Sequence, residues 1–349
     1  MRLTPEHRVA ILLHEGTVGT SGKTGLSLIR YSTANIVVVI DRLCAGESFT
    51  ELTRIPRQLP IVASVQDSLS YSPDVLVIGI APSGGALPAE WLAEIKQAIL
   101  AGMSIVNGLH THLAENEELR ELLTENQWIW DVRREPARLA IGSAASRSLS
   151  CRRVLTVGTD MSIGKMSTSL ELNRVSQQRG LKSKFLATGQ AGLMIAGDGI
   201  PLDAVRVDFA AGAVEQLVMR FGNNYDILHI EGQGSLLHPG STATLPLLRG
   251  SQPTHLILVH RAGQNHIRKH PHVLIPPLDQ VVLLYEMVAS AAGALHPAKI
   301  AAIALNTHHL TDDNAAQNAI EQVTAQTGLP CTDPVRFGAD ILLDAILAV

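Results

Sequence analysis

Residues 158–165 read Gly-Thr-Asp-Met-Ser-Ile-Gly-Lys, and this stretch indicates how the second half of the chain folds. It follows the apolar run 154–157 and precedes a predicted helix over residues 167–178. A strand, a glycine-rich turn with the spacing G-x-x-x-x-G-K and a helix together form the phosphate-binding P-loop. The backbone N–H groups and the helix dipole attract an oxyanion, and the lysine adds a point charge for a terminal phosphate.

The loop departs from the full P-loop motif at one position. The motif has Ser or Thr after the lysine to hold magnesium, whereas this chain has Met166. The sequence therefore predicts phosphate binding, and the missing hydroxyl leaves magnesium-dependent ATP chemistry open. A glycine-rich turn that binds nothing would explain the glycines but not the lysine. The predicted cofactor-binding residues are Gly158, Thr159, Asp160, Gly164, Lys165, Met166, Ser167 and Thr168.

The composition indicates two domains built around parallel sheets. The chain has 349 residues, of which 46% are apolar, 17% charged and 3% aromatic. Single cores rarely grow beyond about 250–300 residues, so the length predicts two domains. Cores made mostly of Ala, Val, Ile and Leu suit parallel sheets covered by helices. The net charge of −4 predicts no nucleic-acid partner.

The sequence carries no signal for a membrane or for export. No apolar run reaches the roughly 18–20 residues that span a membrane, and the N-terminus does not read as a signal peptide. Cys44, Cys151 and Cys331 form no C-x-x-C pair and are expected to be reduced, buried thiols. We therefore expect a cytoplasmic homo-oligomer that acts on a small-molecule substrate and has no membrane partner.

Strand and helix patterns alternate in both halves, which predicts an α/β protein with parallel sheets and right-handed crossovers. The aperiodic segment 140–150 is small and polar and predicts a linker between domains at 1–145 and 151–349. The predicted strands are 9–13, 36–40, 59–63, 75–80 and 104–106, then 153–157, 184–187, 227–230, 255–259 and 300–305. Further predicted helices are 88–100, 115–124, 211–221, 280–291 and 314–327.

A second candidate site residue follows the strand 227–230. Glu231 ends this strand, and in P-loop folds a neighbouring strand often delivers an acid to the magnesium shell or the reacting group. The Gly-Gln-Gly that follows allows a close backbone approach to a ligand. We predict that Glu231 is catalytic and that Gln233 contacts substrate. A glutamate that only caps the next turn is the alternative.

Two other strand ends carry polar residues that are predicted to contact substrate from their position alone. Gln190 follows the strand 184–187, and Asn306 follows the strand 300–305. Ligands of open α/β sheets gather at the carboxyl ends of the strands. Asp226 begins its strand and therefore lies at the wrong end of the sheet.

The first half has its own glycine-rich turn at residues 14–24. It is not a second P-loop, because residue 17 is Thr where that motif needs Gly. Gly16, Gly19 and Gly22 fit G-x-x-G-x-x-G, a variant dinucleotide or CoA turn, and Asp41 is placed to meet a ribose. A plain βα turn explains the glycines equally well. The turn 81–85 closes another strand of the same sheet and is expected to line the same crevice.

The histidines and arginines after residue 260 predict an anion site and not a metal site. No acidic or cysteine partner has ligand spacing near His266, His270 and His272, so we predict no metal. Arg261 and Arg268 belong to a basic loop that faces either an anionic ligand or solvent. Arg268 is the predicted substrate contact.

Several of these motifs resemble known families. The GTDMSIGK loop resembles that of dethiobiotin synthetase, G-T-D-x-x-x-G-K-T, and HIEGQGS at 229–235 resembles that enzyme's strand ending in Glu-Gly. A fuller resemblance covers nearly the whole chain and concerns a two-domain family long catalogued as a domain of unknown function, the D-glutamate N-acetyltransferase family. GKM in place of GKT is typical of that family. The motifs are GKTGLSLIRY, VIDR, GTDMSIGKMST, ATGQAG and HIEGQGSLLHP, in that order.

The family resemblance implies an N-terminal Rossmann-like domain joined to a P-loop NTPase-like three-layer α/β/α domain. It also implies acetyl transfer from acetyl-CoA to the amine of D-glutamate. A P-loop can hold the phosphates of CoA without hydrolysing them, so Met166 is compatible with that activity. Such a reaction needs a base, for which Glu231 and His238 are the candidates, and oxyanion donors, expected from the backbone at 232–234.

Two other functions stay open at this point. A dethiobiotin-synthetase-like ligase or kinase would use ATP with Mg²⁺ at the same loop. A regulatory protein would bind a nucleotide there without turnover.

Overall fold

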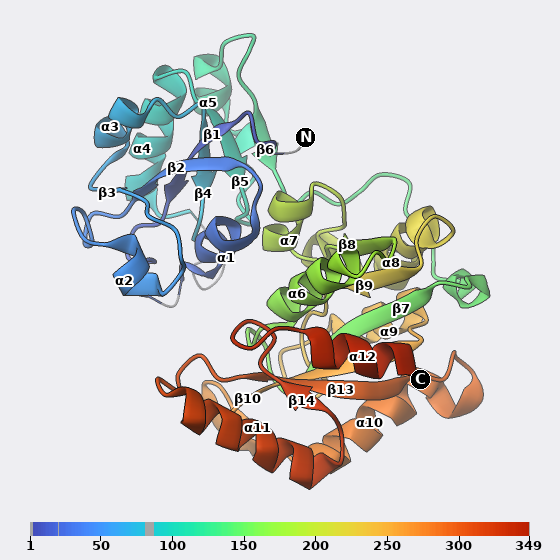
Figure 1. Ribbon diagram of the computed structural model, residues 1–349. Coiled ribbons are helices and arrows are strands. Elements are labelled where there is room, and N and C mark those ends of the chain that lie inside the picture. Colours follow the sequence, from blue (N-terminus) through green and yellow to red (C-terminus); the bar gives the residue numbers. More distant parts are fainter. Residues whose placement is uncertain (1–2, 20, 81–86, 349) are drawn as a thin grey trace. The chain divides into compact units, whose positions relative to one another are not determined.

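The computed structural model describes residues 3–19, 21–80 and 87–348 (Figure 1). The chain forms two compact units, which we call unit 1 and unit 2. Unit 1 comprises Met1–Arg134 with Gln190–Ala204, and unit 2 comprises Glu135–Gly189 with Val205–Val349. Each unit is built around one six-stranded sheet whose described strand pairs are all parallel, so the predicted α/β class is confirmed.

Unit 1 has the strand order β3-β2-β1-β4-β5-β6, the order of dinucleotide-binding Rossmann domains. Residues 9–12 of β1 are fully buried because helices cover both faces of a parallel sheet. Its strands are β1 Arg8–Leu12, β2 Asn35–Ile40, β3 Ile61–Val62, β4 Val75–Ile78, β5 Ser104–Asn107 and β6 Ile129–Asp131. Its helices are α1 Lys23–Tyr31, α2 Phe49–Thr53, α3 Val65–Ser68, α4 Ala89–Leu100, α5 Glu117–Leu122 and α7 Gln190–Ala196.

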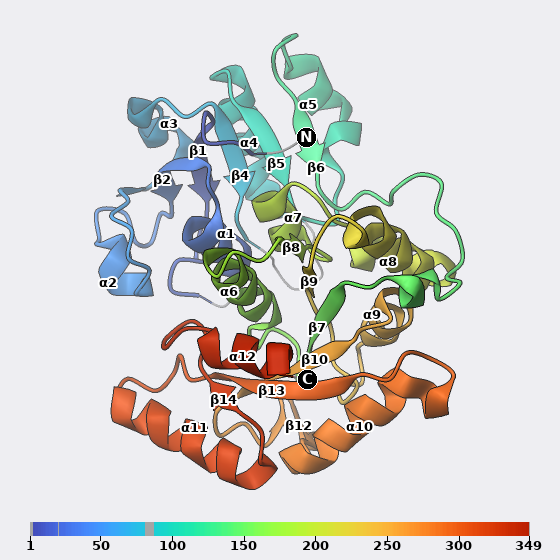
Figure 2. The same ribbon diagram turned by 45° about the vertical axis from the view of Figure 1, so that its right-hand side comes forward.

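Unit 2 has the strand order β14-β13-β10-β7-β9-β8, with the central strand β7 between β10 and β9 (Figure 2). Figure 1 shows α12 and the pair α10–α11 on opposite sides of β13. The strands are β7 Arg152–Gly158, β8 Ser183–Leu186, β9 Ile227–Ile230, β10 His255–Arg261, β13 Lys299–Asn306 and β14 Cys331–Thr332. The helices are α6 Lys165–Gln178, α8 Val207–Gly222, α9 Thr244–Ser251, α10 Leu278–Ser290, α11 Asp313–Thr327 and α12 Asp340–Ala348.

A short antiparallel hairpin extends unit 2 after β10. It is formed by β11 (His266–Ile267) and β12 (His270–Leu274), and its turn carries Arg268 of the predicted basic loop. The core of the unit joins α6, α12 and the central strands, with Leu172, Ile257 and Leu342 among its fully buried side chains. Among the described helices, none combines the length and the apolar composition needed to cross a bilayer.

Two segments lie where local patterns did not place them. The expected linker 140–150 packs on unit 2, where the Ser143 hydroxyl donates to Glu215 at 2.7 Å and the Ser146 hydroxyl to the Gly250 carbonyl at 2.8 Å. Helix α7 follows β8 in sequence yet belongs to unit 1. A Cβ atom on Gly108, just after β5, would lie only 2.7 Å from the Met194 methyl carbon. The predicted domain ranges 1–145 and 151–349 assign residues 190–204 to the second domain, whereas these residues belong to unit 1.

Candidate functional site

The predicted phosphate loop lies at the carboxyl end of the central strand β7 and leads into α6. Gly164, which precedes the helix, has φ +117°, a conformation that favours glycine. The ammonium of Lys165 donates to the carbonyl oxygen of Asp160 at 2.7 Å, and the side chain is only 6% exposed. A Cβ atom on Gly158 would lie 3.3 Å from this nitrogen. The lysine side chain therefore folds back over the loop, and its ammonium lies where an anion held by the loop would bind.

Two predicted cofactor residues brace the loop through their side chains. The carboxylate of Asp160 accepts from the N–H of Met161 at 2.6 Å, the Gln264 side chain at 2.6 Å and the N–H of Arg268 at 2.8 Å. The Thr159 hydroxyl bonds Nδ1 of His260 at 2.9 Å. Both residues are at most 1% exposed, so these side chains hold the loop against β10 and the hairpin.

The start of α6 offers no ordinary magnesium ligand after the lysine. Met166 and Ser167 are half-buried, and Thr168 is buried with its N–H bonded to the Gly164 carbonyl at 2.9 Å. Within the described ranges, no cluster of three or more His, Cys, Asp or Glu side chains could hold a metal ion.

Glu231 directly follows β9, the strand that pairs with β7 on one side. Its Oε2 accepts from the N–H groups of Thr188 at 2.9 Å and Gly189 at 3.1 Å, just past the end of β8. The side chain is 6% exposed. The carboxylate therefore fixes the ends of two strands beside the phosphate loop, and its catalytic role stays a prediction.

The glycines after Glu231 are required by packing. The N–H of Gly232 donates to the Thr156 hydroxyl at 2.9 Å, and a Cβ atom on Gly232 would lie 1.7 Å from the Thr156 carbonyl oxygen. The expectation that this N–H stabilises an oxyanion is thus not met at Gly232, because Thr156 uses it. Gln233 turns its side-chain amide to the carbonyl oxygen and hydroxyl of Thr188.

His238 lies in the loop that follows β9. Its Nδ1 accepts from the N–H of Gly240 at 3.0 Å, so the neutral ring carries its proton on Nε2. Burial lowers the pKa of His238, and the charges of His270 and Lys165 lower it further, although Asp160 opposes them. The ring is therefore neutral at pH 7. In this arrangement it suits hydrogen-bond donation better than proton abstraction.

Loops from both sides of β7 meet at the phosphate loop. The ring of His238 stands edge-on to that of His270 from the hairpin, with centroids 5.2 Å apart. The hydroxyl of Tyr285 in α10 donates to the Gly158 carbonyl at 2.7 Å and accepts from the N–H of Leu236 at 3.1 Å. Tyr285 is a site residue that the sequence patterns did not reveal, because it reads as one apolar position of an amphipathic helix.

The β10 side of the loop is basic. Arg261, the last residue of β10, approaches the carbonyl oxygen of Ser162 at 3.4 Å. Asn306 at the end of β13 donates to the Ile163 carbonyl at 2.8 Å, so it braces the loop, and its predicted substrate contact stays a prediction. Arg268 is anchored through its backbone, and its guanidinium is exposed.

The glycine-rich turn of unit 1 is explained by its own packing. Cβ atoms on Gly16, Gly19 and Gly22 would lie 2.1–2.9 Å from backbone atoms of the same turn. Asp41 is fully buried, and its carboxylate accepts from the N–H groups of Glu15, Thr17 and Leu43, each at 3.1 Å. The carboxylate therefore holds the turn, and contact with a ribose stays a prediction.

Two further predictions concern unit 1. Gln190 lies on α7, and its side-chain amide approaches the Thr24 hydroxyl at 3.4 Å. The turn 81–85 lies outside the described residues. In unit 2, by contrast, the structure gathers Glu231, Gln233, His238, Arg268 and Asn306 on strand ends and loops that adjoin the phosphate loop.

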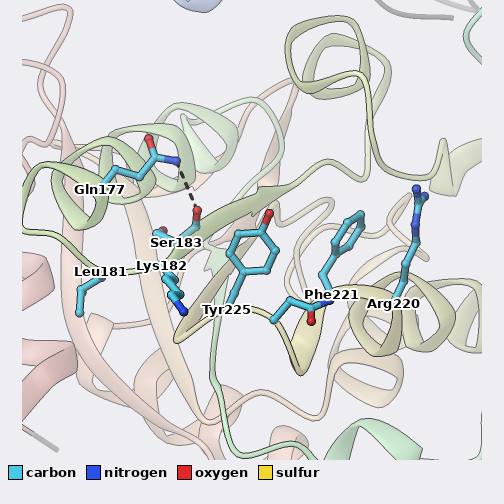
Figure 3. Close-up of a pocket in the computed structure, with 8 residues that line it drawn as sticks. Gln177, Leu181, Lys182, Ser183, Arg220, Phe221 and Tyr225 are labelled. Carbon is cyan, nitrogen blue, oxygen red and sulfur yellow. Dashed lines mark hydrogen bonds between the residues drawn. The ribbon is translucent and has the colours of Figure 1, made fainter.

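A separate pocket of about 570 Å³ lies at the amino ends of the strands of unit 2, opposite the phosphate loop (Figure 3). Lys182 and Ser183 at the start of β8 line it, together with Phe221 and Tyr225. The ammonium of Lys184 lies 4.3 Å from the Phe221 ring centroid. Because this pocket opens at the amino ends of the strands, it is distinct from the phosphate loop.

Comparisons with known proteins agree with this architecture. Residues 140–343 match the family described as "Domain of unknown function (DUF1611_C) P-loop domain", and residues 42–135 match "Domain of unknown function (DUF1611_N) Rossmann-like domain". A protein of Anabaena variabilis, solved by crystallography as a DUF1611 family protein, is 66% identical with a TM-score of 0.97, covering 99% of this chain and 100% of that one.

Two curated relatives carry a functional name. A D-glutamate N-acetyltransferase of Tritonibacter scottomollicae is 38% identical over 288 residues, covering 82% of this chain and 85% of that protein. A D-glutamate N-acetyltransferase of a Pseudoalteromonas species is 35% identical over 305 residues, covering 86% and 89%. The matches over residues 42–135 and 140–343 show that the chain belongs to the DUF1611 family, which joins a Rossmann-like domain to a P-loop domain.

Proposed function

We propose that this protein transfers the acetyl group of an acyl-CoA donor such as acetyl-CoA to the amine of D-glutamate. One observation carries the proposal: a phosphate loop with a curled lysine has methionine at its magnesium position, in a chain 35–38% identical to enzymes with that name. A loop of this kind can hold phosphates that do not react. The donor would supply the activated acetyl thioester.

The residues of unit 2 fit the phosphates of such a donor. Lys165 and the first N–H groups of α6 would hold the pyrophosphate, because helix N-termini and lysine ammonium groups both attract phosphate oxygens. The loop is braced by Asp160 and Thr159, so its backbone is fixed before the ligand arrives. A site fixed in advance loses less free energy on binding.

The acceptor amine must lose a proton, and Glu231 is the residue we assign to that step. The N–H groups of Thr188 and Gly189 donate to its Oε2, and such donors favour the charged carboxylate that a base needs. His238 would then contribute Nε2–H as a donor to the oxygen that gains negative charge during acyl transfer. We assign His238 the donor role because its Nδ1 already accepts a hydrogen bond from Gly240, which leaves Nε2–H to donate.

The test is a direct assay of purified protein with acetyl-CoA and D-glutamate, scoring N-acetylglutamate by mass spectrometry and free CoA by thiol release. L-Glutamate and D-aspartate define the acceptor. Lys165→Ala should weaken CoA binding by about 1.5–3 kcal/mol, or about 10–150-fold, for a lost charge-assisted contact. Lys182→Ala is the matched control, because Lys182 is exposed at the opposite edge of the sheet.

Two results would replace the proposal. ATP binding with a strict magnesium requirement would favour the dethiobiotin-synthetase-like ligase or kinase. Nucleotide binding without turnover of any offered amine or acid would favour a regulatory protein. If Lys165→Ala leaves CoA binding unchanged, the phosphate loop is not the CoA-binding site.

A further inference from the structure

Two arginines are held against the phosphate loop from the β10 side. Arg261 approaches the Ser162 carbonyl oxygen with Nη2 at 3.4 Å, and Arg268 donates its backbone N–H to Asp160 at 2.8 Å. Gln264, between them in sequence, also donates to Asp160 at 2.6 Å. The loop thus holds the guanidinium of Arg261 and the backbone of Arg268.

The nearby carboxylate of Asp160 offsets the positive charge of Arg261 only in part. Among the described residues, neither arginine forms an ion pair with a carboxylate within 4.0 Å, and no side-chain hydrogen bond is made by Arg268. Burial lowers the pKa of Arg261, and the charge of Arg268 lowers it further, while Asp160 opposes both. Two like charges kept close together favour an anion between them.

We propose that Arg261 and Arg268 form a second anion subsite beside the phosphate loop, and that it takes the 3′-phosphate of the CoA-type donor. The inference rests on the proposed acyl-CoA donor. Arg261 ends β10, which pairs directly with β7, so the subsite is one strand away from the pyrophosphate position. Neighbouring strands are about 4.8 Å apart. One ribose unit separates the 3′-phosphate of the donor from its pyrophosphate, so the two groups can reach the ends of neighbouring strands.

The side-chain carboxylate of the acceptor is the other anion that could occupy this subsite. The strand order of unit 2 argues against it. Glu231 directly follows β9, on the other side of β7, so about 9.6 Å of sheet separates the ends of β9 and β10. An extended glutamate places its amine and its side-chain carboxylate only about 5–6 Å apart. An acceptor whose amine meets Glu231 therefore does not extend to the β10 side.

The experiment compares ligands that differ only in the 3′-phosphate. Binding of CoA and dephospho-CoA is measured by calorimetry on the intact protein without acceptor, for the parent, Arg268→Gln and Arg261→Lys. Arg268→Gln should fold normally, since its guanidinium bonds no described residue. Arg249→Gln is the matched control, because Arg249 is exposed on α9.

The parent should bind CoA about tenfold or more tightly than dephospho-CoA, as expected for a charge-assisted contact. Arg268→Gln should abolish most of this ratio and leave dephospho-CoA binding unchanged, and Arg249→Gln should keep the ratio. An equal ratio in parent and Arg268→Gln would overturn the subsite. A separate acetyl-transfer assay compares D-glutamate with D-glutamine: if Arg268→Gln keeps the CoA ratio but loses the parent's preference for D-glutamate, the phosphate assignment is overturned and a carboxylate belongs there. Because binding is measured without turnover, a failed acetyl-transfer assay leaves this test valid.

Discussion

The Tyr285 hydroxyl donates a hydrogen bond of 2.7 Å to the carbonyl oxygen of Gly158, where β7 becomes the phosphate loop. The same hydroxyl accepts from the N–H of Leu236, so one buried side chain joins α10, the phosphate loop and the loop that carries His238. Burial raises the pKa of Tyr285, and the hydroxyl keeps its proton at physiological pH.

Tyr285→Phe should lower the free energy of unfolding by about 1–3 kcal/mol, because it leaves the buried Gly158 carbonyl and the partly buried Leu236 N–H without a partner. Urea unfolding followed by circular dichroism measures the change. Tyr225→Phe, at the opposite edge of the sheet, is the control and should change stability little. Equal stability of the Tyr285→Phe variant and the parent would mean that water replaces the hydroxyl.

Glu231→Gln should reduce turnover by about 10²–10⁴-fold, the range for a positioned general base. The amide oxygen can still accept from Thr188 and Gly189, so the unfolding midpoint should stay close to that of the parent. Steady-state rates with saturating acetyl-CoA and D-glutamate measure the effect. A folded variant that turns over at the parent rate would limit Glu231 to joining the strand ends.

Met166→Thr should restore the hydroxyl of the full P-loop motif without improving acetyl transfer, since no phosphoryl group is transferred. Rates measured with EDTA and with added magnesium should agree within experimental error for both proteins. A strict magnesium requirement in the parent would contradict this and point to Ser167 or Thr168 as the displaced metal ligand.

Acid should destabilise unit 2 through two buried histidines. Burial lowers the pKa of His229 to about 3 and that of His260 to about 4, whereas an unfolded histidine has a pKa of about 6.5. Below pH 6.5 the unfolded chain therefore binds protons that the folded chain does not. The free energy of unfolding should fall by up to about 1.4 kcal/mol per pH unit for each histidine between pH 6.5 and about 4.

Urea midpoints at pH 7.5, 6 and 5 check this prediction. His260→Asn should reduce the dependence of the free energy of unfolding on pH by the contribution of one proton, up to about 1.4 kcal/mol per pH unit. The same substitution at the exposed His309 should not change it. An identical slope in His260→Asn and the parent would assign the acid sensitivity to other groups.

Local sequence patterns predicted most of the sheet architecture. The strands around β1, β2, β4, β7, β9, β10 and β13 were placed within a few residues, because buried parallel strands are continuous apolar runs. The spacing of the glycines and the lysine also identified the phosphate loop, because these residues lie close together in the sequence. The short edge strands β6 and β14 and the hairpin β11–β12 lack such runs and were not predicted.

The partners of individual side chains could not be predicted. The turn around Gly16 looked like a ligand cradle, but its spacing reflects close contacts within its own backbone. The patterns mark Asp41 and Asp160 as ligand residues, which stays a prediction, but they do not show that both carboxylates accept hydrogen bonds from the chain itself. These contacts depend on the fold of segments up to 108 residues apart.

The excursion of Gln190–Ala204 into unit 1 means that the two halves of this protein are not interchangeable modules. Leu193 and Met194 are at most 6% exposed, and Met194 packs against Gly108 of unit 1. A gene fragment that encodes only the second half would display these side chains to water and yield an aggregation-prone product. Recombination between family members therefore has to carry α7 along with the first half, so the family is expected to evolve as a whole chain.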